Sequence, residues 1–177
     1  LPELFREQIT GSSLIANPGC YPTSAILPLA PLVKHGIIES TGIIIDSKSG
    51  VTGAGRNPKL PFHYPECNES IKAYGVGTHR HAPEISQFVT MSGEENAEVI
   101  FTPHLVPMNR GILSTCYLQP SKGSTVADAI EVLHTTYKDE PFIRVTSNPP
   151  ETRAVRHTNF VDLHVAQSGD RLVVLSC

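Results

Sequence analysis

The sequence lacks the features that mark several large classes of protein. No apolar run approaches the ~20 residues that a membrane span needs, and no signal peptide opens the chain. The four cysteines are widely spaced without a CxxC pair, so neither a zinc site nor a disulfide framework is indicated. The net charge of −3 gives no general attraction to nucleic acid or anionic membranes. We therefore expect a protein of the reducing cytoplasm that binds neither nucleic acid, nor membranes, nor a metal.

Two nucleotide-binding signatures are also missing. The sequence contains no G-x-x-x-x-G-K-[ST] loop and no G-x-G-x-x-G between a strand and a helix. Its 177 residues, 40% apolar and 18% charged, suffice for one folded domain with a sizeable core. The chain begins at Leu1 without an initiator Met and ends at Cys177, directly after the strand-like run 172–175. We expect it to be a piece of a longer protein.

Hydrophobic periodicity predicts an α+β domain. Apolar and alternating runs predict strands at 13–16, 42–46, 71–76, 97–106, 111–118, 142–145, 160–165 and 171–176. Helical patterns cover 22–35, 81–92 and 124–138, the last of them capped by Ser124. We expect Pro28 and Pro31 to kink or break the first helix, because each removes a helical hydrogen bond. Strands and helices do not alternate regularly, which favours a mixed, mostly antiparallel sheet with helices on one face.

Cys20 is the first candidate for chemistry. It lies in N-P-G-C-Y-P-T at 17–23, where a short apolar run meets a helical pattern. Gly19 permits an unusual backbone conformation and the close approach of a ligand. A cysteine at a helix N-terminus is favoured in its thiolate form, which is the reactive one. Free cysteines are often merely buried, but the flanking Pro-Gly and Pro-Thr favour a nucleophile here.

Three further stretches carry polar groups suited to a substrate. The Gly- and hydroxyl-rich stretch 47–56 could be a flexible surface loop. Its terminal Arg56, a planar cation, instead favours a nest of backbone N–H groups that binds an anion. His79 and His81 precede a helix, and a metal would need further ligands that do not stand out. One imidazole is better suited as acid or base for Cys20. Arg110 lies between two strands, either solvated or clamping a substrate carboxylate.

Together these motifs resemble the N-acetyl-gamma-glutamyl-phosphate reductases. The matching stretches are N-P-G-C-Y-P-T at 17–23, S-G-V-T-G-A-G-R at 49–56, H-R-H-A-P-E-I at 79–85 and F-T-P-H-L-V-P-M-N-R-G-I at 101–112. The resemblance covers essentially the whole chain. It implies that residues 1–177 form a catalytic and dimerisation domain like the C-terminal domain of glyceraldehyde-3-phosphate dehydrogenase. The family's NADP-binding Rossmann domain and its C-terminal segment are absent from this chain.

The resemblance also implies a reaction and its residues. NADPH would reduce N-acetyl-glutamyl 5-phosphate to the 5-semialdehyde and phosphate through a cysteine thioester, in arginine biosynthesis. Cys20 matches the nucleophile and His79 the acid/base residue. The positions that match the substrate pocket are Ser49, Gly50, Thr52, Gly53, Arg56, His81, Glu84 and Arg110. NADP would be bound mainly by the absent domain, so this chain alone is expected to be inactive. A homo-oligomer, either a dimer or a tetramer, is expected.

Three other interpretations remain open at this point. The first is a related semialdehyde dehydrogenase of the aspartate or aminoadipate type, although the aspartate enzymes lack the H-R-H-x-P-E pattern. The second is a non-reductive cysteine acyltransferase or hydrolase that uses Cys20 and His79 without a nicotinamide. The third is a non-catalytic dimerisation domain that binds ligand weakly.

Overall fold

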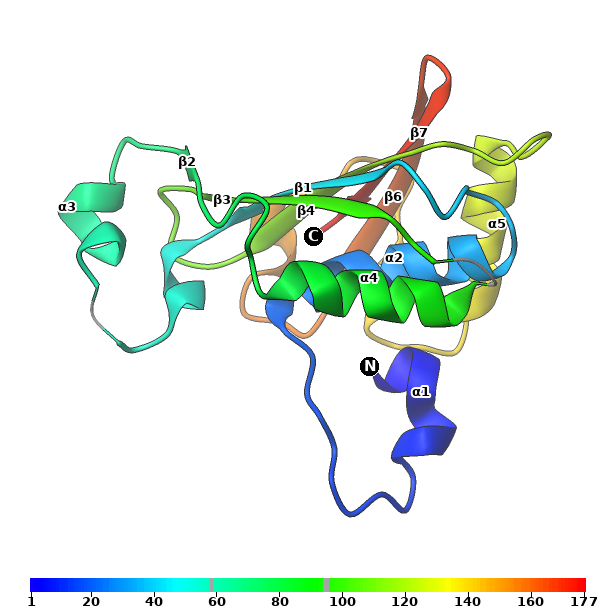
Figure 1. Cartoon of the computed structure of the whole chain (residues 1–177), viewed down its shortest axis with the longest axis horizontal. Helices are drawn as coiled ribbons and strands as arrows, with labels where there is room; N and C mark the ends of the chain where they lie inside the picture. Colours follow the sequence, from blue (N-terminus) through cyan, green and yellow to red (C-terminus); the bar gives the residue numbers. More distant parts are fainter. Residues whose placement is uncertain (58, 94–95) are drawn as a thin grey trace.

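One mixed sheet organises the domain. The computed structural model describes residues 1–57, 59–93 and 96–177. The strands are β1 (Ile43–Ser49), β2 (Lys72–Ala73), β3 (Val99–Leu105), β4 (Ile112–Leu118), β5 (Ile143–Val145), β6 (Val161–Ser168) and β7 (Arg171–Ser176). Their order is β2-β3-β1-β4-β7-β6-β5, with β1–β3 and β5–β6 parallel and the other pairs antiparallel (Figure 1). The predicted mixed, mostly antiparallel sheet is confirmed, including the β6–β7 hairpin.

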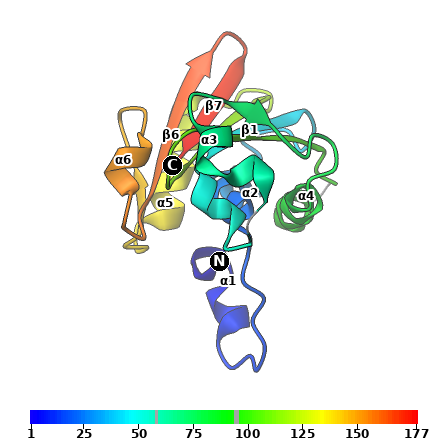
Figure 2. The same cartoon turned by 90° about the vertical axis from the view of Figure 1, so that its left-hand side faces the viewer.

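Helices cover one face of this sheet. The described residues form the helices α1 (Pro2–Ile9), α2 (Cys20–Lys34), α3 (Tyr64–Cys67), α4 (His81–Ser92), α5 (Val126–Tyr137) and α6 (Thr152–Val155), with single 3-10 turns at η1 (Val51–Ala54) and η2 (Leu60–Phe62). The long helices α2, α4 and α5 lie together beneath the sheet (Figures 1 and 2). Along β1, Ile43 and Ile45 are fully buried while Ile44 between them is exposed, because successive side chains point to opposite faces. The core therefore lies between the sheet and these three helices.

The helix α2 corrects one prediction. It is a single helix from Cys20 to Lys34, although it contains Pro28 and Pro31. Pro31 has no N–H to donate to the carbonyl of Leu27, and that carbonyl instead accepts a hydrogen bond from the hydroxyl of Tyr137, at the end of α5. A partner from another helix replaces the lost bond. Nearly all of α2 is buried, so packing also stabilises it as one unbroken helix.

Three other predictions were wrong in detail. The run 13–16 is not a buried strand: it has no strand partner, and Leu14 is 89% exposed. The strand predicted at 71–76 is reduced to the two residues of β2. Thr125, rather than Ser124, caps α5, because its hydroxyl accepts from the N–H of Asp128 while the Asp128 carboxylate accepts from the N–H of Thr125.

The first 19 residues form an N-terminal arm that projects from the body of the domain (Figures 1 and 2). Its helix α1 is anchored by Arg6, which donates two hydrogen bonds to the Glu140 carboxylate at 2.7 and 2.8 Å. The Phe5 ring also packs on Phe88 of α4, with centroids 5.5 Å apart. Within the described ranges, no helix is long and apolar enough to cross a membrane.

Candidate active site

Cys20 is the first residue of α2, and its side chain is exposed. The preceding Gly19 has φ −67° and ψ 161°, an ordinary extended conformation, so the expected unusual backbone is not the reason for glycine here. A methyl group on Gly19 would collide with the imidazole ring of His81. Glycine is required because it lets this histidine lie against the backbone next to the thiol.

Hydrogen bonds from α4 and from the first turn of α2 hold the backbone of Gly19 in place. The Gly19 N–H donates to the Glu84 carboxylate at 3.0 Å, and the Gly19 carbonyl accepts from the N–H and the hydroxyl of Thr23. Glu84 therefore orients the backbone beside Cys20. A charge-assisted bond of this kind is stronger than one between neutral groups. The helix that begins with Cys20 and the helix that begins with His81 are therefore joined at Gly19.

The two histidines occupy different environments. The Nδ1 of His79 accepts a hydrogen bond from the N–H of His81 at 3.2 Å, and its ring lies among those of Tyr21, Tyr74 and Phe101. His81 is 7% exposed, and its buried Nδ1 has no hydrogen-bond partner among the described residues. His81, rather than His79, is the imidazole that lies against Gly19. This geometry favours His81 as the partner of Cys20.

Both imidazoles are favoured in their neutral form. Burial, followed by the charges of His81 and Arg80, lowers the pKa of His79 below its usual value. Burial also lowers the pKa of His81, with Glu84 acting in the opposite direction and Arg80 in the same one. A neutral imidazole can accept the proton of a thiol, so either ring is prepared for that step near pH 7.

The Gly-rich loop does not form the predicted anion nest. The N–H groups of Gly50, Val51 and Thr52 donate to the carbonyls of Gly111, Met108 and Asn109, respectively. The Thr52 hydroxyl also donates to the Asn109 carbonyl at 2.6 Å. These donors therefore already make hydrogen bonds to the segment that joins β3 to β4. The loop supports the backbone of Arg110 and leaves anion binding to side chains.

A cavity of about 510 Å³ opens beside Cys20. Six of the residues predicted for the site line it, namely Cys20, Ser49, Gly50, Thr52, Gly53 and Arg110. Arg56 is exposed at the end of the loop and does not line this cavity, and neither do His79, His81 and Glu84. The structure thus brings the thiol, the loop and Arg110 together and leaves Arg56 apart.

The far wall of this cavity was missed by the sequence analysis. It comes from α6 and the segment that follows, with Arg156, His157 and Thr158, and from Cys177 at the end of β7. Burial, followed by the charges of Asp162 and Glu151, raises the pKa of the Cys177 thiol to about 11, so this second sulfur stays protonated. The only local signal was the cluster of basic residues in T-R-A-V-R-H at 152–157.

A buried chain of hydroxyls fixes α2 to the sheet below the cavity. The Ser24 and Ser114 hydroxyls are 2.7 Å apart, and those of Ser114 and Ser47 are 2.6 Å apart. Ser24 also donates to the Tyr21 carbonyl at 2.9 Å. The helix α2 and the strands β1 and β4 are thus linked one helical turn after Cys20, which limits the movement of α2. In the part of the chain that the structure describes, no cluster of three or more metal-ligating side chains is found.

Comparison with known proteins identifies the class. The family described as semialdehyde dehydrogenase, dimerisation domain, matches residues 20–177, and the chain belongs to this family. The fold agrees: an aspartate semialdehyde dehydrogenase II from Vibrio cholerae superposes with a TM-score of 0.73 at 15% identity, covering 98% of this chain and 61% of that one. The enzyme from Francisella tularensis gives a TM-score of 0.73 at 11% identity, covering 99% and 64%.

Closer relatives carry a more particular name. The chain is 54% identical to the N-acetyl-gamma-glutamyl-phosphate reductase of Rhodopirellula baltica and 51% identical to that of Pelobacter propionicus, in each case over 99% of this chain and 52% of the relative. The resemblance seen in the sequence is therefore confirmed. The chain spans about half the length of these relatives.

Proposed function

We propose that this chain is the catalytic and dimerisation domain of an NADP-dependent N-acetyl-gamma-glutamyl-phosphate reductase of arginine biosynthesis. The observation that carries the proposal is an exposed cysteine at the N-terminus of a buried helix, beside a neutral histidine and a cavity lined by arginines. A thiolate, a base and cations for an anionic substrate are the groups that acyl transfer from an acyl phosphate needs. The reductases named above are the relatives at about 50% identity.

The chemistry of this chain begins with the thiol. His81 takes the proton of Cys20, and the sulfur attacks the carbonyl carbon of the acyl phosphate. The carbon–oxygen bond to phosphate then breaks, which releases phosphate and leaves an acyl thioester on Cys20. We prefer His81 for this step because its ring lies against Gly19, and we keep His79 as the alternative. His79 then acts as a positioning residue through its bond to the His81 N–H.

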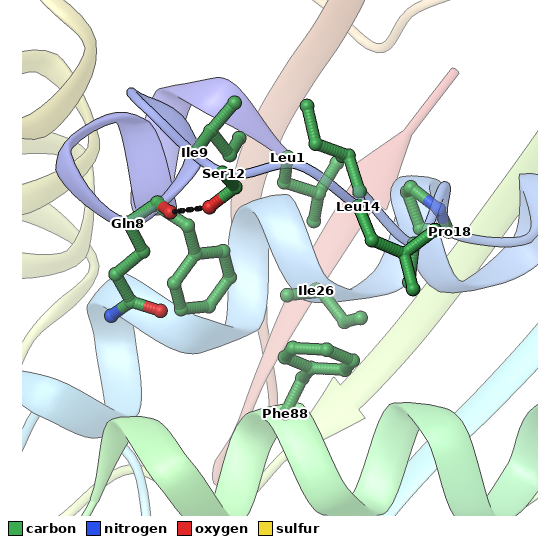
Figure 3. Close-up of a pocket in the computed structure, with 11 residues that line it drawn as sticks. Leu1, Gln8, Ile9, Ser12, Leu14, Pro18, Ile26 and Phe88 are labelled. Carbon is green, nitrogen blue, oxygen red and sulfur yellow. Dashed lines mark hydrogen bonds between the residues drawn. The ribbon is translucent and has the colours of Figure 1, made fainter.

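The residues of this chain do not fit a dinucleotide. No G-x-G-x-x-G turn leads from a strand to a helix. In the Gly-rich loop, the N–H groups of Gly50, Val51 and Thr52 donate to backbone carbonyls and are not available to a pyrophosphate. We therefore place NADP on a domain outside the chain, and no step here is routed through it. The N-terminal arm offers a surface for that domain: a cavity of about 200 Å³ lies between the arm and Ile26 of α2 and Phe88 of α4, and Leu1 and Leu14 of the arm also line it (Figure 3).

The open face of the sheet supports a homo-oligomer. Ile44 of β1 is in register with Ile100 of β3 and Tyr117 of β4, so three exposed apolar side chains form a row across the middle of the sheet. An apolar row of this kind is typical of an interaction surface, and the matching family is described as a dimerisation domain. We propose that two copies pack through this face. Sedimentation analysis of Ile100→Lys, which should dissociate without unfolding, tests this proposal.

The proposed reaction is tested in the full-length protein with N-acetyl-gamma-glutamyl phosphate. With NADPH, the wild type should release phosphate and oxidise NADPH in equal amounts. Without NADPH it should release one equivalent of phosphate per site and then stop, because the thioester accumulates. Cys20→Ser should release none above background.

The alternatives predict different outcomes in the same experiment. A cysteine hydrolase would release phosphate continuously without NADPH. A semialdehyde dehydrogenase of the aspartate or aminoadipate type would prefer the aspartyl or aminoadipyl phosphate when substrates are compared at equal concentration. A non-catalytic domain would give no burst of phosphate at all.

A further inference from the structure

Two arginines lie on the border between neighbouring cavities. Arg110 and Arg156 line the cavity that contains Cys20, and both also line a second cavity of about 360 Å³, which Cys20 does not reach. Neither cavity is lined by an aspartate or a glutamate among the described residues, and Arg153 adds a third cation to the second one. The border between the cavities therefore carries positive charge, and the acidic side chains nearby, such as Glu151, do not line it.

Both guanidinium groups are unpaired. Among the described residues, neither Arg110 nor Arg156 makes a side-chain hydrogen bond or an ion pair. Arg153, by contrast, pairs with Glu151 at 3.4 Å, and Arg144 binds Asp162 through two nitrogens at 2.6 and 2.8 Å. Two neighbouring cations without counter-charges repel each other, and a bound anion would relieve that repulsion.

The backbone holds the two arginines in a fixed relation. The segment that carries Arg110 is bonded to the Gly-rich loop, and it also packs on α6. Gly111, at φ 118°, lies so close to Thr152 that a methyl group there would be 3.0 Å from its Cβ, and the Thr152 hydroxyl lies 3.8 Å from the Met108 sulfur. After Arg156, His157 adopts φ 67°, which is uncommon for a residue with a side chain and is typical of functional sites.

The proposed substrate carries two anionic groups. The acyl phosphate must lie at the Cys20 sulfur, because its carbonyl carbon is attacked there. The α-carboxylate lies at the other end of the acyl chain and stays on the substrate through both halves of the reaction. The N–H groups of Gly50, Val51 and Thr52 already donate to backbone carbonyls, whereas the guanidinium groups at the cavity border are free to bind this carboxylate. Their planar forks match a carboxylate.

Resting on the proposed function, we propose that Arg156 is a second substrate-binding residue, which together with Arg110 clamps the α-carboxylate of the acyl phosphate. Its partner Arg110 was predicted from the sequence, whereas Arg156 comes from a segment 46 positions further along the chain. The two arginines then select an acyl chain that ends in a carboxylate at this distance from the thiol.

The test compares two substrates in the full-length protein. One is N-acetyl-gamma-glutamyl phosphate, and the other is acetamidobutanoyl phosphate, the same acyl phosphate without the α-carboxylate. Arg156→Ala should lower kcat/KM roughly 10- to 100-fold on the first substrate, mainly through KM, and less than about twofold on the second. Arg156→Lys should recover only part of the loss, because an ammonium lacks the planar fork.

Arg153→Ala is the matched control. Arg153 lies in α6, three residues before Arg156, and lines only the second cavity, so its removal should leave kcat/KM unchanged on both substrates. Equal losses of Arg156→Ala on the two substrates, or no loss on either, would overturn the assignment. If the wild type reduced neither acyl phosphate, the proposed function itself would be wrong. Arg156 is exposed, so thermal unfolding should confirm that each variant folds.

Discussion

Cys20 and Cys116 show how differently one domain can treat the same side chain. Cys20 is exposed at the first residue of α2, with the thiol at the mouth of a cavity. Cys116 lies in the middle of β4, between β1 and β7, and is 0% exposed. Burial raises the pKa of the Cys116 thiol to about 12, so it behaves as a small apolar side chain. The reactivity of a cysteine therefore depends on where the fold places it. Experiments that replace or label each of the two cysteines test this contrast.

The largest expected effect comes from replacing each cysteine in turn. Cys20→Ser should lower kcat at least about a thousandfold, because a hydroxyl is a far weaker nucleophile than a thiolate at neutral pH. Cys116→Ala should keep nearly all activity and instead lose roughly 1 kcal/mol of stability by leaving a small void. Turnover and urea unfolding of both variants measure the contrast. Near wild-type turnover in Cys20→Ser would refute the covalent mechanism.

The histidine variants sharpen the description of the Cys20 site. His81→Asn should lower kcat about a hundredfold and remove the neutral limb of the pH profile, since we propose that this ring, which lies against Gly19, takes the proton. His79→Asn should have a smaller effect and keep that limb. The sequence match favours His79 for the role. Loss of the limb in His79→Asn alone would reverse our assignment.

Alkylation compares the two thiols directly. Iodoacetamide should label Cys20 at least about tenfold faster than Cys116 in the native protein, because the Cys20 sulfur is exposed whereas Cys116 is fully buried and burial raises its thiol pKa. Peptide mass spectrometry gives both rates from one sample. In urea the two rates should converge, and faster native labelling of Cys116 would contradict the structure.

The smallest effect is a loss of stability at high pH. The Cys116 thiol ionises near pH 9 in the unfolded chain but only at about pH 12 in the folded protein, so the native state holds more protons between these values. The free energy of unfolding should therefore fall as pH rises above 9, by about 1 kcal/mol at pH 10 from this group. Cys116→Ala should show a shallower fall. An equal fall in both proteins would assign the effect to other groups.

Local patterns explain which parts of the fold could be predicted. The helices α4 and α5 and the β6–β7 hairpin follow from the spacing of their apolar residues and from turn residues next to them. The run 13–16 looked like a strand, but a strand also needs a partner, and none lies beside it among the described residues. The continuity of α2 was hidden because the hydroxyl that replaces its lost hydrogen bond comes from α5.

The residues of the candidate site likewise divide into those that local motifs predict and those that only the fold reveals. Cys20 and Arg110 were found because short motifs surround them, and both line the cavity. The anion nest was wrong, since the sequence does not show that the N–H groups of Gly50 and Thr52 are taken by the segment before β4. Arg156 was missed because only the folded chain brings the segment after α6 to the cavity that Cys20 lines.

The bond between Tyr137 and Leu27 has a consequence for the order of folding. It joins residues 110 positions apart, and it completes the helix whose first residue is Cys20. During synthesis, the segment that becomes α2 leaves the ribosome long before Tyr137 does, and with two prolines it has little helical preference of its own. The helix whose first residue is Cys20 is therefore completed by tertiary assembly and not by its local sequence alone.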